Sequence, residues 1–303
     1  MCGARKAGPD ERKKHNVAES RPDKELGSLP ADPANPADPA PAPAGIDTST
    51  AHISRVYNYW LGGKDNFAVD RAAAEQVIAA YPVVLASVRA QRAFLGRAVH
   101  FLAAEACITQ FLDIGTGLPS ADNTHEVAQR AAPRSRIVYV DNDPIVRTHA
   151  DALLTSGSRG SVTYFEADLR NPDPILRVAA ATLSIGKPVA LLLAGVLQCI
   201  PDSDDPAGIV RRLLAGLAPG SYLVLAHPAS DIHTRQIGVA ATRFNQLAYR
   251  GVTLRGRDAV QGFLHGMDLV EPGLVQLHRW RPGPGGPEPG HDLANYGAVG
   301  RKP

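Results

Sequence analysis

Short apolar segments alternate with helical segments along the second half of the chain, and this order limits the possible folds more than any other feature. The apolar segments lack the polar alternation of strands that face solvent on one side. They therefore predict a parallel sheet covered by helices on both faces, an α/β fold. Strands are predicted at 111–114, 137–140, 162–167, 189–193 and 222–226, with helices between them near 123–132, from 144, 173–183 and from 206.

The first predicted strand ends in Asp113-Ile-Gly115-Thr-Gly117. In a parallel sheet, ligands bind at the carboxyl ends of the strands, and glycines there let the backbone turn tightly and approach a ligand closely. A carboxylate ahead of the glycines favours a ligand that carries an amine or another cation. S-Adenosylmethionine (SAM), with an ammonium group and a sulfonium, is such a ligand.

The next three strands also end in candidate contacts. Asp141 is placed to accept hydrogen bonds from two ribose hydroxyls, whereas Asp143 is better explained as the cap of the following helix. A carboxylate at Asp168 can accept from an adenine amino group, and the alternative is a turn residue. The predicted cofactor contacts after these strands are Asp141, Asn142, Asp168, Leu169 and Gly195.

His227 follows the fifth strand and is the first candidate for a general base, with Asp65 the second. A histidine at this edge can exchange a proton near neutral pH, although a single histidine is more often structural. The other histidines show no metal-ligand spacing. The sequence therefore predicts no metal site.

The N-terminal part has a different character. Residues 1–46 form a Pro/Ala-rich segment that we expect to be disordered, because it cannot bury enough apolar surface to fold. Residues 47–110 are predicted to be helical, with helices near 52–60, 70–80 and 84–105. A turn containing Gly62 and Gly63 separates the first two helices.

Composition excludes several classes of protein. Lys and Arg total 32 and Asp and Glu total 30, a net charge of +2, so no electrostatic argument favours nucleic-acid or membrane binding. The three cysteines form neither a disulfide framework nor a zinc motif. No apolar run is long enough to span a membrane, and the first residues lack the apolar core of a secretory signal. We therefore expect a cytoplasmic protein.

Taken together, these motifs resemble a bacterial family of SAM-dependent methyltransferases that was once known only as a domain of unknown function. The likeness runs from about residue 48 to the C-terminus, and its first stretch is the most specific. Asn58 and Trp60 depart from the pattern, where we expect Asp and Leu. The matching stretches are Arg55–Phe67, Phe111–Pro119, Val138–Pro144, Asp168–Arg170 and Tyr296–Pro303.

The resemblance implies the class I SAM-dependent methyltransferase fold, a Rossmann-like seven-stranded sheet with the last strand antiparallel. Residues 274–280 and 296–300 are then the sixth and seventh strands. Residues 47–110 are expected to form a helical lid over a SAM-binding domain at 111–303. The lid is expected to offer Tyr57, Gly63 and Lys64 to the cofactor. The resemblance names neither the methyl acceptor nor the oligomeric state. We expect the acceptor to be a small molecule that is methylated at O or N.

Two other classes stay open from the sequence. One is a non-catalytic protein of the same fold that binds a metabolite. The other is an NAD-dependent oxidoreductase, which is disfavoured because Ser120 replaces the third glycine of the dinucleotide motif. A nucleic-acid methyltransferase is disfavoured because the fourth strand is not followed by an Asn/Asp-Pro-Pro-aromatic sequence.

Overall fold

The computed structural model describes residues 46–120, 122–146, 160–283 and 292–303. Contacts between residues divide the chain into a unit at Met1–Ala40 and a unit at Pro41–Pro303, and every described residue belongs to the second. The segment predicted to be disordered, 1–46, thus lies outside the described residues except for residue 46. In the described part of the chain, no helix is long and apolar enough to cross a membrane.

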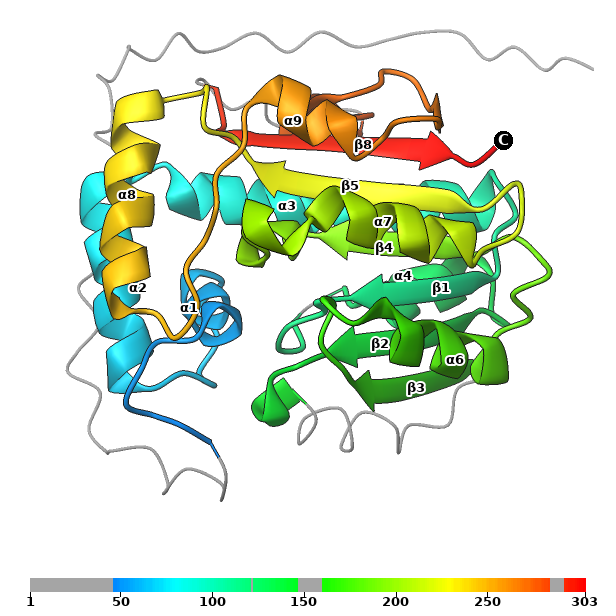
Figure 1. Cartoon of the computed structure of the whole chain (residues 1–303), viewed down its shortest axis with the longest axis horizontal. Coiled ribbons are helices and arrows are strands. Elements are labelled where there is room, and N and C mark those ends of the chain that lie inside the picture. The colour runs from blue at the N-terminus through cyan, green and yellow to red at the C-terminus, as the bar shows by residue number, and fades with distance from the viewer. Residues whose placement is uncertain (1–45, 121, 147–159, 284–291) are drawn as a thin grey trace, which may run out of the picture. The chain divides into compact units, whose positions relative to one another are not determined.

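Five parallel strands form the centre of one sheet, in the order β3-β2-β1-β4-β5. All five agree with the predicted strands to within about two residues at each end. β8 runs antiparallel beside β5, which confirms the Rossmann-like sheet with an antiparallel last strand (Figure 1). The strands are β1 (Gln110–Ile114), β2 (Arg136–Asp141), β3 (Ser161–Glu166), β4 (Ala190–Ala194), β5 (Tyr222–Pro228) and β8 (Asn295–Arg301).

The predicted sixth strand at 274–280 is wrong in its extent. Only β7 (Val275–Gln276) is extended there, and a second short strand, β6 (Asp268–Leu269), pairs with the other half of β8. The chain instead turns into a 3-10 helix at Leu277–Arg279. Arg97 donates to the carbonyl oxygens of Leu277 and Trp280. The Trp280 ring is fully buried against Phe94. Because of these contacts, residues 277–280 do not pair with β8 as a strand.

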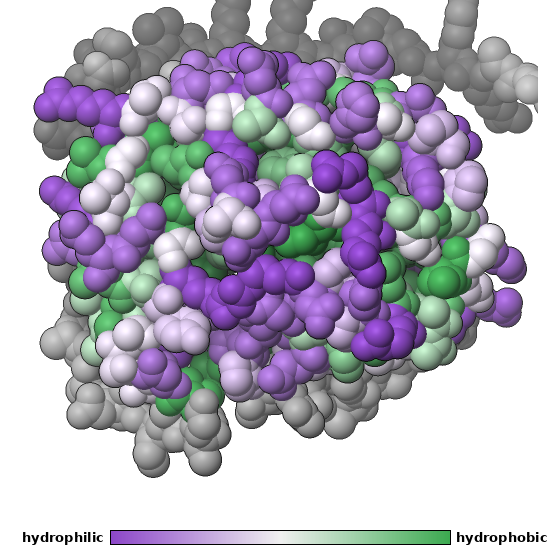
Figure 2. Space-filling view, in the orientation of Figure 1, coloured by the Kyte–Doolittle hydropathy of each residue, from purple (hydrophilic) through white to green (hydrophobic). Residues whose placement is uncertain are grey.

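Apolar side chains cover both faces of the sheet, because successive residues of a strand point to opposite sides. Phe111 and Ile137 pack with α3 (Val84–Ala104) and α4 (Thr124–Ala131) on one side. Leu112 and Val138 pack with α6 (Pro172–Thr182) and α7 (Pro206–Ala215) on the other. Hydrophilic residues cover most of the outer surface in Figure 2, with hydrophobic residues visible between them.

Helices also cover the carboxyl ends of the parallel strands, to the left of the sheet in Figure 1. They are α1 (Ile53–Trp60), α2 (Ala68–Ala80) and α8 (Thr234–Leu247), and α9 (Arg257–Gly262) follows near β8. A backbone bridge between Ala51 and Ala248 joins the beginning of this region to the end of α8. We call residues 46–80 the N-terminal layer.

A buried ion pair fixes the N-terminal layer. The Asp70 carboxylate is fully buried and lies 3.0 Å from Arg55 Nε. It also accepts hydrogen bonds from the backbone N–H groups of His52 and Phe67, both at 2.9 Å. Arg55 Nη1 and Nη2 donate to the carbonyl oxygens of Asp47 and Thr50, respectively. One carboxylate therefore joins the starts of α1 and α2.

Replacing Asp70 with Ala should destabilise the protein by about 3–5 kcal/mol, because it leaves the buried Arg55 charge without a partner. Urea unfolding followed by circular dichroism measures the change. Asp173→Ala is the matched control, since Asp173 pairs with Arg212 at the surface and such pairs contribute little. Equal effects of the two substitutions would contradict this assignment.

Candidate functional site

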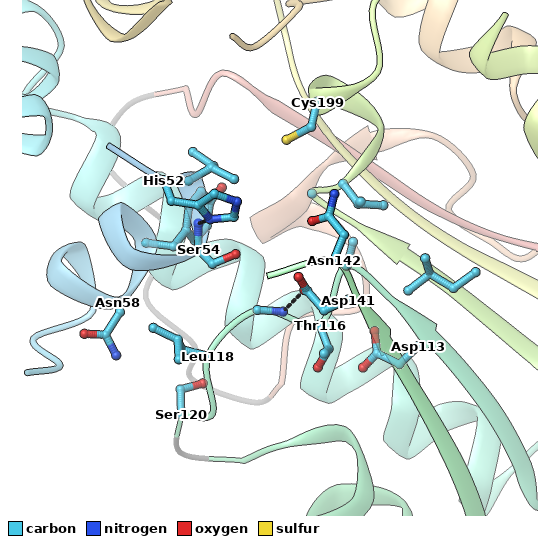
Figure 3. Close-up of a pocket in the computed structure, with 18 of the residues that line it drawn as sticks. His52, Ser54, Asn58, Asp113, Thr116, Leu118, Ser120, Asp141, Asn142 and Cys199 are labelled. Atoms are coloured by element: carbon cyan, nitrogen blue, oxygen red, sulfur yellow. Dashed lines mark hydrogen bonds between the residues drawn. The ribbon is translucent and has the colours of Figure 1, made fainter. Parts of the chain in front are cut away.

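A cavity of about 320 Å3 lies at the carboxyl ends of β1, β2, β3 and β4, beneath α1 and beside α3. Its size is within the range of small-molecule and cofactor sites. In Figure 3, His52 and Ser54 face it from the N-terminal layer, and Asp113, Asp141 and Asn142 face it from the sheet. The predicted cofactor contacts that line it are Tyr57, Gly63, Asp113, Gly115, Gly117, Asp141, Asn142, Asp168, Leu169 and Gly195.

Two glycines let the strand ends form this cavity. Gly115 and Gly195 have φ angles of 73° and 86°, which L side chains rarely adopt. A Cβ atom at Gly115 would lie 2.4 Å from the Val196 side chain. One at Gly195 would lie 2.3 Å from the Gln91 amide nitrogen. Any larger residue at either position would displace a wall of the cavity.

Asp141 holds the glycine turn in place. Its Oδ2 accepts a hydrogen bond from Gly117 N at 2.8 Å, drawn in Figure 3, and its Oδ1 accepts from Asp143 N at 3.0 Å. Burial raises the pKa of Asp141, and these two hydrogen bonds act against that rise. Each carboxylate oxygen has a second lone pair, so Asp141 can still accept hydrogen bonds from a ligand.

Asp113 lies deeper in the same wall and is only 5% exposed. Burial raises its pKa to about 6, and the hydrogen bond from Thr124 Oγ1 and the nearby Arg92 charge lower it in part. Arg92 also lines the cavity. A buried carboxylate and a guanidinium thus stand close together, which suits a ligand that carries both an ammonium and a carboxylate.

Asp168 and Leu169 line the cavity beyond β3. Both Asp168 oxygens accept hydrogen bonds from Arg170, which is the main reason that the pKa of Asp168 is lowered. Leu169 is buried and offers an apolar surface beside them. This part of the wall is therefore suited to a flat ring with polar edges.

A chain of hydrogen bonds joins α1 to the sheet. Tyr57 donates its hydroxyl hydrogen to Gln91 Oε1 at 3.2 Å, and Gln91 Nε2 donates to the carbonyl oxygen of Ala194 at 3.2 Å. Gln91 was not predicted. Its role arises because α3 passes beside the end of β4, a contact between residues 103 positions apart.

The turn after α1 is built around Asn58. Its Oδ1 accepts from Asp65 N at 3.0 Å and from Asn66 Nδ2 at 2.9 Å. An aspartate oxygen would serve as the same acceptor, which explains in physical terms how Asn58 fits a position where Asp is expected. Lys64 and Asp65 are exposed and do not line the cavity. The structure thus does not bring these two predicted residues to the site.

The contact between His52 and Asp143 was also missed by the sequence analysis. His52 Nδ1 lies 2.8 Å from Asp143 Oδ2 and 3.4 Å from Ser54 N. Burial acts to raise the pKa of Asp143, but the His52 hydrogen bond and charge outweigh it, and the pKa is lowered. Asp143 also caps residues 144–146 through Ile145 N, as predicted. A histidine and an aspartate so far apart in the sequence give no local pattern that would predict this contact.

His227 is fully buried and does not line the cavity. Its Nδ1 lies 2.8 Å from the carbonyl oxygen of Pro228, and its Nε2 accepts from Arg255 Nη1 at 2.9 Å. Both nitrogens are therefore occupied within the protein. The predicted role of His227 as general base does not fit this geometry, which is that of a structural residue.

His227 should also make the protein less stable in acid. Burial, with the Arg255 charge, lowers its pKa from 6.5 to about 4, so the unfolded chain binds a proton that the folded protein does not. The stability that neutral His227 contributes is complete above pH 6.5 and is lost as the pH falls toward 4.

From pH 7 to pH 5 this loss should be about 2 kcal/mol larger in the wild type than in His227→Gln. Urea unfolding of both proteins at the two pH values measures the difference. The same pH dependence in both would show that His227 is not held neutral.

Comparison with known proteins connects this site to one family. A model of the S-adenosyl methyltransferase family matches residues 39–303. A DUF574 family protein from Streptomyces avermitilis is 42% identical with a TM-score of 0.81, and the match covers 85% of this chain and 99% of that protein. A methyltransferase candidate from Thermobifida fusca is 38% identical with a TM-score of 0.77, covering 86% and 98%. No curated protein gives a significant match. The chain therefore belongs to the S-adenosyl methyltransferase family, with the class I SAM-dependent methyltransferase fold.

Proposed function

We propose that the protein transfers the methyl group of SAM to an oxygen or nitrogen atom of a small molecule in the bacterial cytoplasm. The observation that carries this proposal is the set of carboxylates at consecutive strand ends, which face one cavity of about 320 Å3 together with a glycine turn. Each carboxylate matches a different part of SAM. Family membership supports the same reaction and gives no support to an NAD-dependent oxidoreductase.

We assign the parts of the cofactor to the walls as follows. Asp141 accepts from the ribose hydroxyls, with Asn142 beside it. The adenine lies against Asp168 and Leu169. Asp113 attracts the ammonium group, and Arg92 attracts the carboxylate of the same amino-acid end. The backbone at Gly115, Gly117 and Gly195 approaches this end closely, which the φ angles of these glycines permit.

The N-terminal layer helps to position the reactants and to exclude water from the cavity. SAM supplies an electrophilic methyl group on a sulfonium, and the protein accelerates its transfer mainly by holding the reactants in line and excluding water. Tyr57 and Gly63 cover the cavity from above. We therefore propose that residues 47–110 act as the lid of the domain at 111–303. We assign no proton transfer to His227 or Asp65, because neither lines the cavity.

Isothermal titration calorimetry with SAM and with S-adenosylhomocysteine (SAH) tests the proposal. We expect both to bind with micromolar Kd. Asp141→Ala should weaken SAH binding by about 1.5–3 kcal/mol, or roughly 10-fold to 150-fold, the value of hydrogen bonds to a charged group. Asp173→Ala is the control and should bind as the wild type does.

The absence of binding in a folded sample would refute the cofactor assignment. Binding without any labelled methyl transfer to cell extract would favour the non-catalytic alternative.

The affinity for SAH should also depend on pH. Burial raises the pKa of Asp113 to about 6, and only the ionised carboxylate attracts the ammonium group. SAH should therefore bind about tenfold more weakly at pH 5 than at pH 7.5. Asp113→Asn should bind more weakly at pH 7.5 and lose most of this dependence. A wild-type Kd that does not change with pH would rule out ionised Asp113 as the partner of the ammonium group.

A further inference from the structure

A second, smaller cavity of about 80 Å3 lies among α1, α2, α3 and α8. Most of its lining is apolar, with Trp60 from α1, Val88 from α3 and Phe244 from α8 among the side chains. Nothing in the assignment of the cofactor uses this space. An apolar cavity of this size holds a small hydrocarbon group or most of a single ring, since about 150 Å3 is known to hold a whole benzene molecule.

The second cavity shares a wall with the first. Ile53 and Tyr57 line both cavities. The short 3-10 helix after β4 (Leu197–Cys199) separates them further along, because Gln198 lines the second cavity and Cys199 lines the first. A molecule in the second cavity therefore lies next to the cofactor site, on the side where α1 meets the end of β4.

Two buried polar atoms at the second cavity lack hydrogen-bond partners among the described residues. They are Ser87 Oγ and Gln198 Oε1, in side chains of residues that are 3% and 2% exposed. Leaving a buried polar atom unpaired destabilises the folded protein, so such an atom calls for an explanation. Gln198 Oε1 can only accept, and the Ser87 hydroxyl can donate or accept. A ligand group that pairs with Gln198 Oε1 therefore carries an O–H or N–H.

We propose that the second cavity binds the methyl acceptor, a small molecule with an apolar ring or branched chain and a hydroxyl or amine group. The apolar part packs against Trp60 and Phe244, and the O–H or N–H donates to Gln198 Oε1. In the transfer, a lone pair of that oxygen or nitrogen forms the new bond to the methyl carbon, the C–S bond of the sulfonium breaks to leave SAH, and the proton is released to solvent. This inference rests on the proposed methyl transfer, because the acceptor must lie beside SAM. It adds the chemical class of the acceptor, which is an apolar alcohol, phenol or amine rather than a sugar, a nucleotide or an acid.

Phenol and anisole are suitable probes, because they share a ring but only phenol donates a hydrogen bond. Binding to the protein is measured by saturation-transfer NMR and by the change in tryptophan fluorescence, to which Trp60 and Trp280 both contribute, with and without saturating SAH. We expect phenol to bind at least fivefold more tightly than anisole. Gln198→Leu should remove this preference. Equal binding of the two probes to the wild type would overturn the role of Gln198.

Ala241→Leu fills the cavity from α8, where Ala241 lines it. Phenol affinity should fall at least tenfold, while the Kd for SAH stays within twofold of the wild type. Ala180→Leu is the matched control, since Ala180 is exposed on α6, and it should change neither. Unchanged phenol binding in Ala241→Leu would overturn the proposed site.

A turnover assay links the cavity to the reaction. The protein is incubated with labelled SAM and a panel of phenols, anilines and short branched alcohols. Labelled product should form only from compounds whose binding Ala241→Leu weakens, and that variant should form much less of it. Product formed equally well by Ala241→Leu would overturn the acceptor assignment.

The same samples distinguish a failure of the proposed methyl transfer from a failure of the proposed acceptor site. If SAH does not bind in calorimetry, the methyltransferase proposal fails, whatever phenol does. If SAH binds and phenol does not, only the acceptor site is wrong.

Discussion

The buried ion pair between Asp70 and Arg55 is the interaction on which the rest of the site depends. The Asp70 carboxylate joins the backbone of His52 and Phe67 to the guanidinium of Arg55 inside the N-terminal layer. This ion pair fixes the position of α1. Tyr57 on α1 therefore lies between the two cavities and donates a hydrogen bond to Gln91. A buried ion pair gives little net stability, but losing one partner is costly. Asp70 thus contributes mainly by fixing the position of the layer.

The sheet supplies the other half of the site through the ends of its strands. Asp141 binds the amide of Gly117, so the second strand sets the position of the turn after the first. His52 reaches from the N-terminal layer to Asp143, two residues further along. The layer and the sheet are therefore joined at the place where we assign the ribose. Positioning of this kind is what methyl transfer requires from a protein.

The sheet and its ligand-binding edge could be predicted from the sequence, because continuous apolar strands and short loops fix both. Asp113 and Asp141 lie at the carboxyl ends of β1 and β2, Gly195 directly follows β4, and all three were found in this way. Contacts between distant segments were not found. Gln91 and His52 reach the cavity only because α3 packs on the sheet and α1 packs on α2 and α3. His227 lies at the end of a strand too, but Arg255 occupies its Nε2, and no local pattern shows this.

Crystallisation of the protein with SAH shows whether the strand ends hold the cofactor. SAH should lie in the larger cavity, with both ribose hydroxyls within hydrogen-bond distance of Asp141, the adenine against Leu169, and the ammonium group beside Asp113. The sulfur atom should face the wall formed by Tyr57 and the turn at Gln198 and Cys199. SAH bound elsewhere, or bound there with its ribose away from Asp141, would refute the assignment of the cofactor site.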